Sequence, residues 1–411
     1  MKNSLIERIV QQPKEEKIMS NIISTAYTKV KDRIVELKLI KKIRDMGELL
    51  CIPFYHSFPK LSKSVPGIVK GIMYKVTAGS GVGKTQLAKA LFVFAPLNYL
   101  RNNPDSKIKI KIFYFALEES EEEFIDTLIC NQLAVKFGIR MDVMTLKGYR
   151  EDYVTDELMA KIEECAEDVE FYMQHIEVID SVSNPTGMYK FCRTYSEKVG
   201  THYWDDVEFT KTGADGNKVV SKDKVYREYV PHDPNLHVIC IADHISLITP
   251  EYDKKSDKVL SQHQSMAKWS THYCRGQMTK HWGWTVINIQ QQEQSGEKQH
   301  YTNTGVSVVK KTEPTLDGLA NNKEIQRDDY VILAVYSPDR FGFEEYDGYD
   351  IARMRDTFRV VIVRKNRLGV PNKYVPLLFD GATNRFVELP FPDDKNIENA
   401  YRNSDELLGR R

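Results

Sequence analysis

The sequence predicts an α/β fold with a doubly wound, mostly parallel central sheet. From Gly71 onward, short apolar runs typical of buried strands alternate with helical stretches. A glycine-rich loop connects the first of these strands to a helix, and polar side chains follow the ends of several other strands. In open α/β sheets, sites form at the carboxyl ends of the strands, so we expect the chemistry at these positions.

Residues 1–50 are interpreted as an N-terminal helical or linker segment. Between Val30 and Ile43 the apolar residues recur every three or four positions, and lysine and arginine fill most positions between them. This spacing predicts an amphipathic helix with a basic outer face. Two interpretations stay open: the helix packs on its own domain, or it is a linker that docks on a neighbouring subunit.

Residues 51–390 are predicted to form the main domain. Its strands are expected at Ile72–Val76, at Ile108–Phe115, within Val169–Ile179, and at Val238–Ala242, Thr285–Ile289, Tyr330–Val335 and Phe358–Val363. At about residues 195–235, two strand-like runs flank a Gly/Asp turn, which predicts a β-hairpin insertion of unknown role. Residues 391–411 are expected to form a polar C-terminal tail.

The composition excludes several classes of protein. The 58 Lys and Arg residues balance the 58 Asp and Glu residues, so a nucleic-acid partner would need locally concentrated positive charge. The six cysteines lack CxxC spacing, which argues against a zinc module or a disulfide framework. Residues 1–17 lack the apolar core of a signal peptide, and no apolar run approaches the roughly 20 residues of a membrane helix. We therefore expect a soluble, cytoplasmic protein.

The segment Ala78–Thr85 predicts a phosphate-binding loop (P-loop), although Ala78 stands where the usual pattern has Gly. Glycines let backbone N–H groups converge on phosphates, and the following helix adds the positive end of its dipole. We expect ATP and Mg²⁺ as ligands, with Lys84 at the β- and γ-phosphates and the Thr85 hydroxyl on Mg²⁺. The expected nucleotide contacts are Gly79, Ser80, Gly81, Val82, Gly83, Lys84 and Thr85.

Hydrolysis of ATP also needs a carboxylate for Mg²⁺ and a group that orients the attacking water. Asp243 ends an apolar strand downstream of the P-loop, where a metal-organising aspartate belongs. Glu118 ends the strand after the P-loop helix, where it could polarise water, and Gln291 ends a further strand. A single acid at a strand end is weak evidence, but the ordered series of P-loop, Glu, Asp and Gln is stronger.

With these residues in place, the chain from about Ile52 to Phe386 resembles the RecA-like ATPase core of DnaB-type ring helicases. The resemblance implies a RecA-like P-loop NTPase in which Glu118 is the catalytic glutamate and Gln291 senses the γ-phosphate. It also implies that Arg367 is an arginine finger and Lys365 its companion, both acting on the nucleotide of the adjacent subunit. The segments that carry the resemblance are Phe115–Ser120, Asp243–Ile248, Ile289–Gln291, Glu324–Asp329 and Arg364–Gly369.

The resemblance weakens at the loop that grips DNA in this family. That loop usually has an Arg-Glu-Ser-Gly-like sequence, whereas Leu319–Lys323 has neither the Arg nor the Gly. Candidate contacts to the DNA backbone are Lys310, Lys311, Asn321, Asn322 and Lys323.

The resemblance implies an ATP-dependent DNA helicase of replication, assembled as a homo-oligomer that is expected to be a hexameric ring. It implies single-stranded DNA as the partner and a primase or loader as a further candidate, in a bacterial cell or a phage-infected host. Two alternatives stay open. One is a RecA- or KaiC-like DNA-binding ATPase or recombinase without unwinding, and the other is a nucleotide-dependent scaffold protein that uses the 195–235 hairpin to contact a partner.

Overall fold

The computed structural model describes residues 30–38, 40–42, 44–45, 49–151, 154–212, 218–253, 257–293, 312–319, 322 and 324–410. The chain divides into two compact units, Met1–Cys51 and Ile52–Arg411. In the first unit, residues 30–38, 40–42 and 44–45 are helical, within the span where the sequence predicts the amphipathic helix. The apolar side chains Val30, Ile34 and Leu37 of this helix are exposed.

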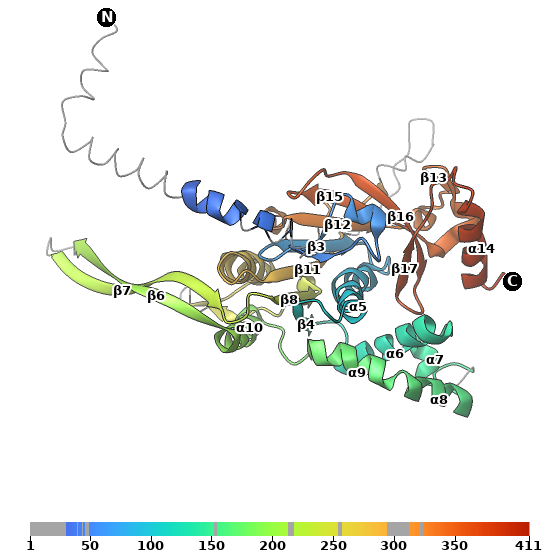
Figure 1. The fold of residues 1–411 in the computed structure, drawn as a ribbon, viewed down its shortest axis with the longest axis horizontal. Helices are drawn as coiled ribbons and strands as arrows, with labels where there is room; N and C mark the ends of the chain where they lie inside the picture. The colour runs from blue at the N-terminus through green and yellow to red at the C-terminus, as the bar shows by residue number, and fades with distance from the viewer. Residues whose placement is uncertain are drawn as a thin grey trace, which may run out of the picture. The chain divides into compact units, whose positions relative to one another are not determined.

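The second unit is built on a nine-stranded sheet in the order β17-β16-β15-β12-β3-β11-β8-β4-β5. Six neighbouring strands are parallel: β3 (Met73–Ala78), β4 (Lys109–Ala116), β5 (Ile176–Ile179), β8 (Leu236–Asp243), β11 (Thr285–Gln291) and β12 (Val331–Tyr336). Three antiparallel strands extend one edge: β15 (Phe358–Asn366), β16 (Lys373–Asp380) and β17 (Arg385–Glu388). The predicted α/β fold with a mostly parallel sheet is confirmed, and Figure 1 shows the helices around this sheet.

Helices cover both faces of the sheet because its central strands are apolar on both sides. One face packs against α4 (Lys84–Lys89), η1 (Ala90–Phe94), α5 (Ala95–Asn102), α6 (Glu121–Phe137) and α9 (Ala166–His175). The other face packs against α10 (Pro185–Val199), α11 (Gln262–Ala267) and η3 (Lys268–Thr279). In β4, for example, Ile112 and Tyr114 point into the first core, whereas Phe113 and Phe115 point into the second.

The remaining elements are short. They are β1 (Ile52–Pro53), α3 (Pro59–Ser62), β2 (Gly67–Ile68), α7 (Val143–Leu146), α8 (Asp156–Glu164), η2 (Ile245–Leu247), β9 (Tyr252–Asp253), β10 (Lys258–Val259), η5 (Glu324–Arg327), η6 (Pro338–Phe341), β13 (Glu345–Tyr346), β14 (Tyr349–Asp350), α13 (Ile351–Met354) and η7 (Arg355–Thr357). None of the helices in the described part of the chain is long and apolar enough to cross a membrane.

The predicted hairpin insertion is present and is longer than its two strand-like runs indicate. Strands β6 (Gly200–Thr212) and β7 (Lys218–Pro231) pair along their whole length as an antiparallel ribbon, and residues 213–217 of the predicted turn lie outside the described residues. The ribbon is inserted between α10 and β8, so it starts and ends at the amino edge of the parallel strands. Figure 1 shows it projecting away from the sheet.

The C-terminal segment differs from the predicted polar tail. Residues Ile397–Leu407 form helix α14, and its Ala400 and Tyr401 are buried in a cluster with Phe358 and Leu378. The segment is polar on average, but its few apolar residues recur at helical spacing and so face one core. Residues 397–407 are therefore part of the second unit, and describing them as a tail is wrong.

Candidate nucleotide-binding site

The P-loop joins β3 to α4 at the carboxyl edge of the sheet. Gly81 and Gly83 have φ angles of 68° and 105°, which L side chains rarely adopt. A Cβ atom on Gly83 would also lie 3.5 Å from the ring of Phe379. The helix begins at Lys84, so the backbone N–H groups of its first turn face the loop. This conformation fits the phosphate cradle that the sequence predicts.

A cavity of about 230 Å³ lies above this loop and brings together three of the predicted strand ends. Its lining residues are Ser80, Gly81, Gly83, Lys84, Thr85, Gln86, Glu118, Glu119 and Asp243. The P-loop, the candidate catalytic glutamate and the candidate metal-organising aspartate therefore share one site, although they lie far apart in the sequence.

Thr85 and Asp243 form the part of this site that fits Mg²⁺. The Thr85 hydroxyl donates to Asp243 Oδ1 at 3.1 Å, and the Tyr114 hydroxyl donates to Asp243 Oδ2 at 2.6 Å. Burial raises the pKa of Asp243, and the hydrogen bond from Tyr114 and the nearby lysines oppose this rise. A hydroxyl and a carboxylate at this distance are hard oxygen donors of the kind that Mg²⁺ prefers. The two residues are thus placed to hold a metal ion against nucleotide phosphates.

Glu118 lies on the opposite side of the cavity. Its carboxylate is half-exposed, 3.8 Å from Lys84 Nζ and 3.6 Å from His244 Nε2. The next residue, Glu119, forms an ion pair with Lys89 at 2.7 Å, and burial raises the pKa of its carboxyl group. Because Glu119 is committed to Lys89, Glu118 is the carboxylate that is free to approach a water molecule in the cavity.

A helix cap fixes this pair of glutamates in place. Helix α6 starts after Ser120, whose hydroxyl accepts a hydrogen bond from the Glu123 backbone N–H at 3.2 Å, and the Glu123 carboxylate accepts one from the Ser120 N–H at 3.1 Å. This capping box ends the link from β4, so Glu118 sits between a buried strand and a capped helix. The sequence reasoning missed His244, which is 5% exposed and follows Asp243 directly. Burial and the positive charge of Lys84 lower the pKa of this histidine.

Gln291 lies at the P-loop end of β11, paired in register with Ala78. It is partly exposed, whereas its neighbours Gln290 and Gln292 are buried. Gln292 donates to Thr77 Oγ1 at 3.0 Å, so it braces the strand beneath the loop. Of these three glutamines, Gln291 has the position that suits a γ-phosphate sensor.

Lys365 and Arg367 are not near the P-loop of their own chain. Strand β15 runs opposite to β12, so its last residues lie at the amino edge of the sheet, across from the start of β12. Lys365 Nζ donates to the Gln326 carbonyl at 2.5 Å, and the exposed Arg367 donates to the Arg327 carbonyl at 3.0 Å. The P-loop lies at the carboxyl edge, so this chain cannot bring its own Arg367 to its own cavity without refolding.

Arg359 is a residue of the site that the sequence reasoning missed. It is 1% exposed in the middle of β15, and its Nε atom donates to the Val82 carbonyl of the P-loop at 2.8 Å. It also pairs with Asp356 Oδ1 at 2.8 Å, and burial lowers the pKa of its guanidinium. Arg340 donates to the Ser80 carbonyl. Two arginines thus hold the outer P-loop, and an arginine inside an apolar strand was the signal that could have revealed Arg359.

A buried ion pair beneath the site was also missed. Lys75 Nζ lies 3.2 Å from Asp329 Oδ2 and donates to Gln290 Oε1 at 2.6 Å, and both charged side chains are fully buried. Lys75 is on the P-loop strand, Gln290 is beside the candidate sensor, and Asp329 precedes β12. Buried charges on three central segments demand partners, so a lysine within the apolar run before the P-loop was the available signal.

The predicted DNA contacts are only partly within reach of the structure. Lys310, Lys311, Asn321 and Lys323 lie outside the described residues, and their roles stay predictions. Asn322 is 2% exposed, and its side chain donates to the His263 carbonyl at 3.1 Å and accepts from the Glu324 N–H at 3.0 Å. In this conformation its amide stabilises the chain turn and does not face solvent.

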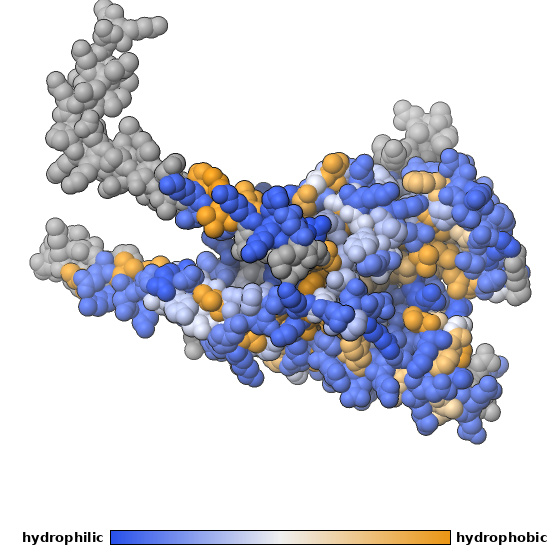
Figure 2. All heavy atoms as spheres, in the orientation of Figure 1, coloured by the Kyte–Doolittle hydropathy of each residue, from blue (hydrophilic) through white to orange (hydrophobic). Residues whose placement is uncertain are grey.

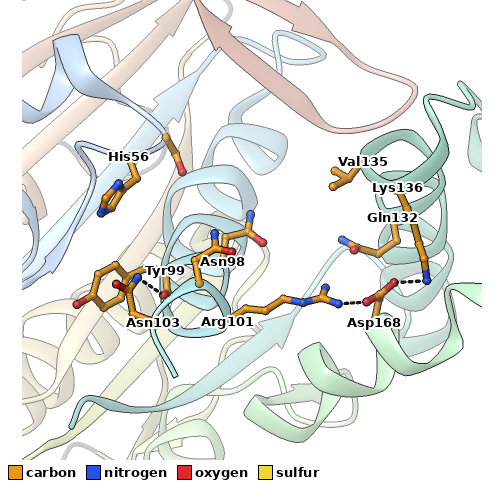
Figure 3. A pocket seen from close by; sticks show the side chains of 11 residues that line it. His56, Asn98, Tyr99, Arg101, Asn103, Gln132, Val135, Lys136 and Asp168 are labelled. Carbon is orange, nitrogen blue, oxygen red and sulfur yellow. Dashed lines mark hydrogen bonds and ion pairs between the residues drawn. The ribbon is translucent and has the colours of Figure 1, made fainter. Parts of the chain in front are cut away.

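A second polar pocket of about 550 Å³ lies between α5, α6 and α9. Figure 3 shows Arg101 and Lys136 approaching Asp168 from opposite sides. Burial raises the pKa of Asp168, but its ion pairs with these two cations outweigh burial and hold the pKa below its usual value. Both cations are thus committed to a carboxylate, so this pocket suits a triphosphate less well than the P-loop cavity does.

Comparison with known proteins supports the fold. No protein-family model and no curated protein sequence matches the chain. Among solved structures, one ATPase domain matches with a TM-score of 0.58 and 16% identity, covering 87% of this chain and 98% of that one. A DnaB-like replicative helicase, whose structure was reported with its interactions with primase, matches with a TM-score of 0.57 and 17% identity, covering 94% and 78%. The chain therefore has the RecA-like ATPase fold of DnaB-like helicases.

Proposed function

We propose that this protein is an ATP-dependent DNA helicase of the DnaB type. It hydrolyses ATP between the subunits of a hexameric ring, moves along single-stranded DNA and unwinds duplex DNA during replication. The observation that carries the proposal is the cavity in which Thr85 contacts Asp243 while Glu118 lies opposite, 3.8 Å from Lys84. The position of Arg367 at the other edge of the sheet supports sites shared between subunits.

Each residue has a separate task in this proposal. Lys84 and the backbone N–H groups of the P-loop bind the phosphates, and Thr85 and Asp243 hold Mg²⁺, which neutralises charge that develops on the phosphates. Glu118 orients and polarises the attacking water, and Gln291 responds to the presence of the γ-phosphate. Arg367 and Lys365 of one copy contribute positive charge to the site of the next copy.

The DNA and protein partners rest on weaker support. Lys310, Lys311, Asn321 and Lys323 are proposed to follow the DNA backbone, which predicts binding with little sequence preference and a steep dependence on salt. A primase or a loader is proposed as a further partner because one matching helicase structure was reported with primase.

The substitution Glu118→Gln is expected to preserve ATP binding and to reduce hydrolysis by about 10²-fold or more, because it removes the group that activates water. Binding is measured with a fluorescent ATP analogue and turnover by phosphate release. Glu121→Gln, which removes a carboxylate from the exposed first turn of α6, is the matched control and should leave turnover near wild type. Normal turnover in Glu118→Gln would assign the water-activating role to another residue.

Strand displacement on a forked duplex with ATP tests the helicase itself. We expect the wild-type protein to displace the strand and Lys84→Ala to displace none, because Lys84→Ala should abolish productive nucleotide binding. The altered sequence at Leu319–Lys323 favours a second candidate, a RecA- or KaiC-like ATPase that binds DNA without unwinding it. DNA-stimulated hydrolysis without displacement would support that candidate, and ATP binding with negligible turnover would support a scaffold.

A further inference from the structure

The ribbon formed by β6 and β7 has two long edges without a partner in the described part of the chain. The two strands, of 13 and 14 residues, pair only with each other, so one side of each strand leaves its backbone N–H and C=O groups unpaired. A two-stranded ribbon is marginally stable by itself, and an unpaired edge is a ready template for another strand. Figure 2 shows that the ribbon is mainly hydrophilic, with apolar side chains scattered along it.

The root of the ribbon is held firmly by aromatic packing. His202 on β6 packs against Tyr229 on β7 at 4.9 Å and against Trp282 of the body at 5.6 Å, measured between ring centroids. Tyr226 contacts Trp204 at 5.1 Å and His281 of the body at 4.5 Å. These contacts fix the direction in which the arm leaves the domain, so its outer part is presented in a defined orientation.

Charges are separated between the two strands on one face of the ribbon. Asp206 and Glu208 of β6 lie directly opposite Lys224 and Lys222 of β7, and the Glu208–Lys222 pair closes to 3.0 Å. On this face the described part of β6 carries only acidic charges and that of β7 only basic charges. All four side chains are exposed, so each of them can accept a second partner of opposite sign.

We propose that the ribbons of neighbouring copies of this chain pair edge to edge, with β6 of one copy against β7 of the next. In a ring, all ribbons point the same way, so β7 of one copy runs antiparallel to β6 of its neighbour. Each carboxylate then lies between two lysines, and each lysine between two carboxylates. The contact uses different surfaces on the two copies, which is the type of interface that closes into a ring. The inference rests on the proposed ring.

The charge of the ribbon argues against nucleic acid as the occupant of these edges. Residues 200–231 contain six acidic and five basic side chains, so they present no excess of positive charge to a phosphate backbone. Arg227, which could contact phosphate, already binds Asp205 at 3.2 Å and Glu228 at 3.3 Å. A second copy of the ribbon, in contrast, offers charges of matching sign at both edges.

Two charge-reversed variants of the full chain test the pairing. The β6 variant carries Asp206→Lys and Glu208→Lys, and the β7 variant carries Lys222→Glu and Lys224→Glu. Each variant by itself places like charges at every edge contact, so we expect its assembly to require about ten-fold or more higher protein concentration. A 1:1 mixture should recover assembly, because alternating copies again meet opposite charges. Sedimentation velocity at low and high salt measures the oligomer fraction.

The mixture separates contacts between copies from contacts within one ribbon, since mixing cannot restore a pair inside a chain. A variant with all four reversals regains every pair and should assemble like the wild type. Reversing the surface Lys161–Glu164 pair on α8 is the control and should change nothing. Normal assembly of the single-strand variants, a mixture that does not recover, or a wild-type protein that stays monomeric would each overturn the inference.

Two further readouts identify other outcomes. If the β7 variant binds single-stranded DNA more weakly while its assembly is normal, the arm contacts nucleic acid and the pairing between copies is wrong. Binding of a fluorescent ATP analogue should be unchanged in both variants, because the P-loop lies at the opposite edge of the sheet from the ribbon. Loss of ATP binding in the wild type would overturn the proposed function, whereas the sedimentation result would still decide the pairing.

Discussion

Replacing Arg367 with alanine is expected to lower ATP turnover by about 10³-fold, the scale of other arginine fingers, while nucleotide affinity stays near wild type. The guanidinium is exposed at the amino edge of the sheet, bound to the Arg327 carbonyl, and far from the Ser80–Thr85 cradle of its own chain. It therefore contributes nothing to binding within a monomer, and it can add positive charge only to a transition state held by another copy. Phosphate release and an equilibrium titration with an ATP analogue measure the two quantities.

Mixed rings make the shared site visible. Subunits with Arg367→Ala keep an intact P-loop and Glu118, and subunits with Glu118→Gln keep an intact finger. Where these two subunits meet in the correct order, one complete site forms, so a mixture of two inactive proteins should regain part of the wild-type turnover. Arg402→Ala, which removes an exposed guanidinium from α14, should not change turnover and serves as the control. Full activity in a dilute monomer would contradict the shared site.

The core of the candidate site could be predicted because its parts have local signatures. The P-loop needs glycine at defined positions, and Asp243 and Gln291 directly follow apolar runs that are too short and too β-branched to be helices. Parallel strands carry their ends to one edge, so residues 78, 118, 243 and 291 meet there for a topological reason. The position of Arg367 at the other edge also follows from topology, since β15 is antiparallel to β12.

Residues that act through distant partners could not be predicted in this way. Arg359 supports the Val82 carbonyl from 277 positions away, and no local pattern identifies that acceptor. Average polarity also misled the prediction for residues 397–407, because a helix buries only one stripe of its surface. The length of the β6–β7 ribbon escaped prediction because both of its faces are largely exposed, so alternation of apolar and polar residues is weak there.

The substitution Lys75→Met is expected to lower the free energy of unfolding by about 3 kcal/mol or more, because it leaves the Asp329 carboxylate buried without its cation. Lys75 and Asp329 are both fully buried and 3.2 Å apart, so neither charge has access to water as an alternative partner. Chemical denaturation followed by circular dichroism measures the loss. A change below about 1 kcal/mol would mean that the pair is not a stabilising element of the sheet.

A second substitution and a pH series separate the charge from the packing. Adding Asp329→Asn to Lys75→Met should recover a large part of the lost stability, since the uncompensated charge is gone. Burial raises the pKa of Asp329 to about 6, against an ordinary value of 3.8. Between these two values the unfolded chain has released the proton that the folded chain still holds, so this group's contribution to stability falls as the pH rises from about 4 to 6 and is constant above. The difference in unfolding free energy between the wild type and Asp329→Asn should show this decline. In Lys75→Met the decline should extend to higher pH, because the lysine charge holds the pKa of Asp329 down. A difference that does not depend on pH would show that Asp329 is ionised in both states throughout this range.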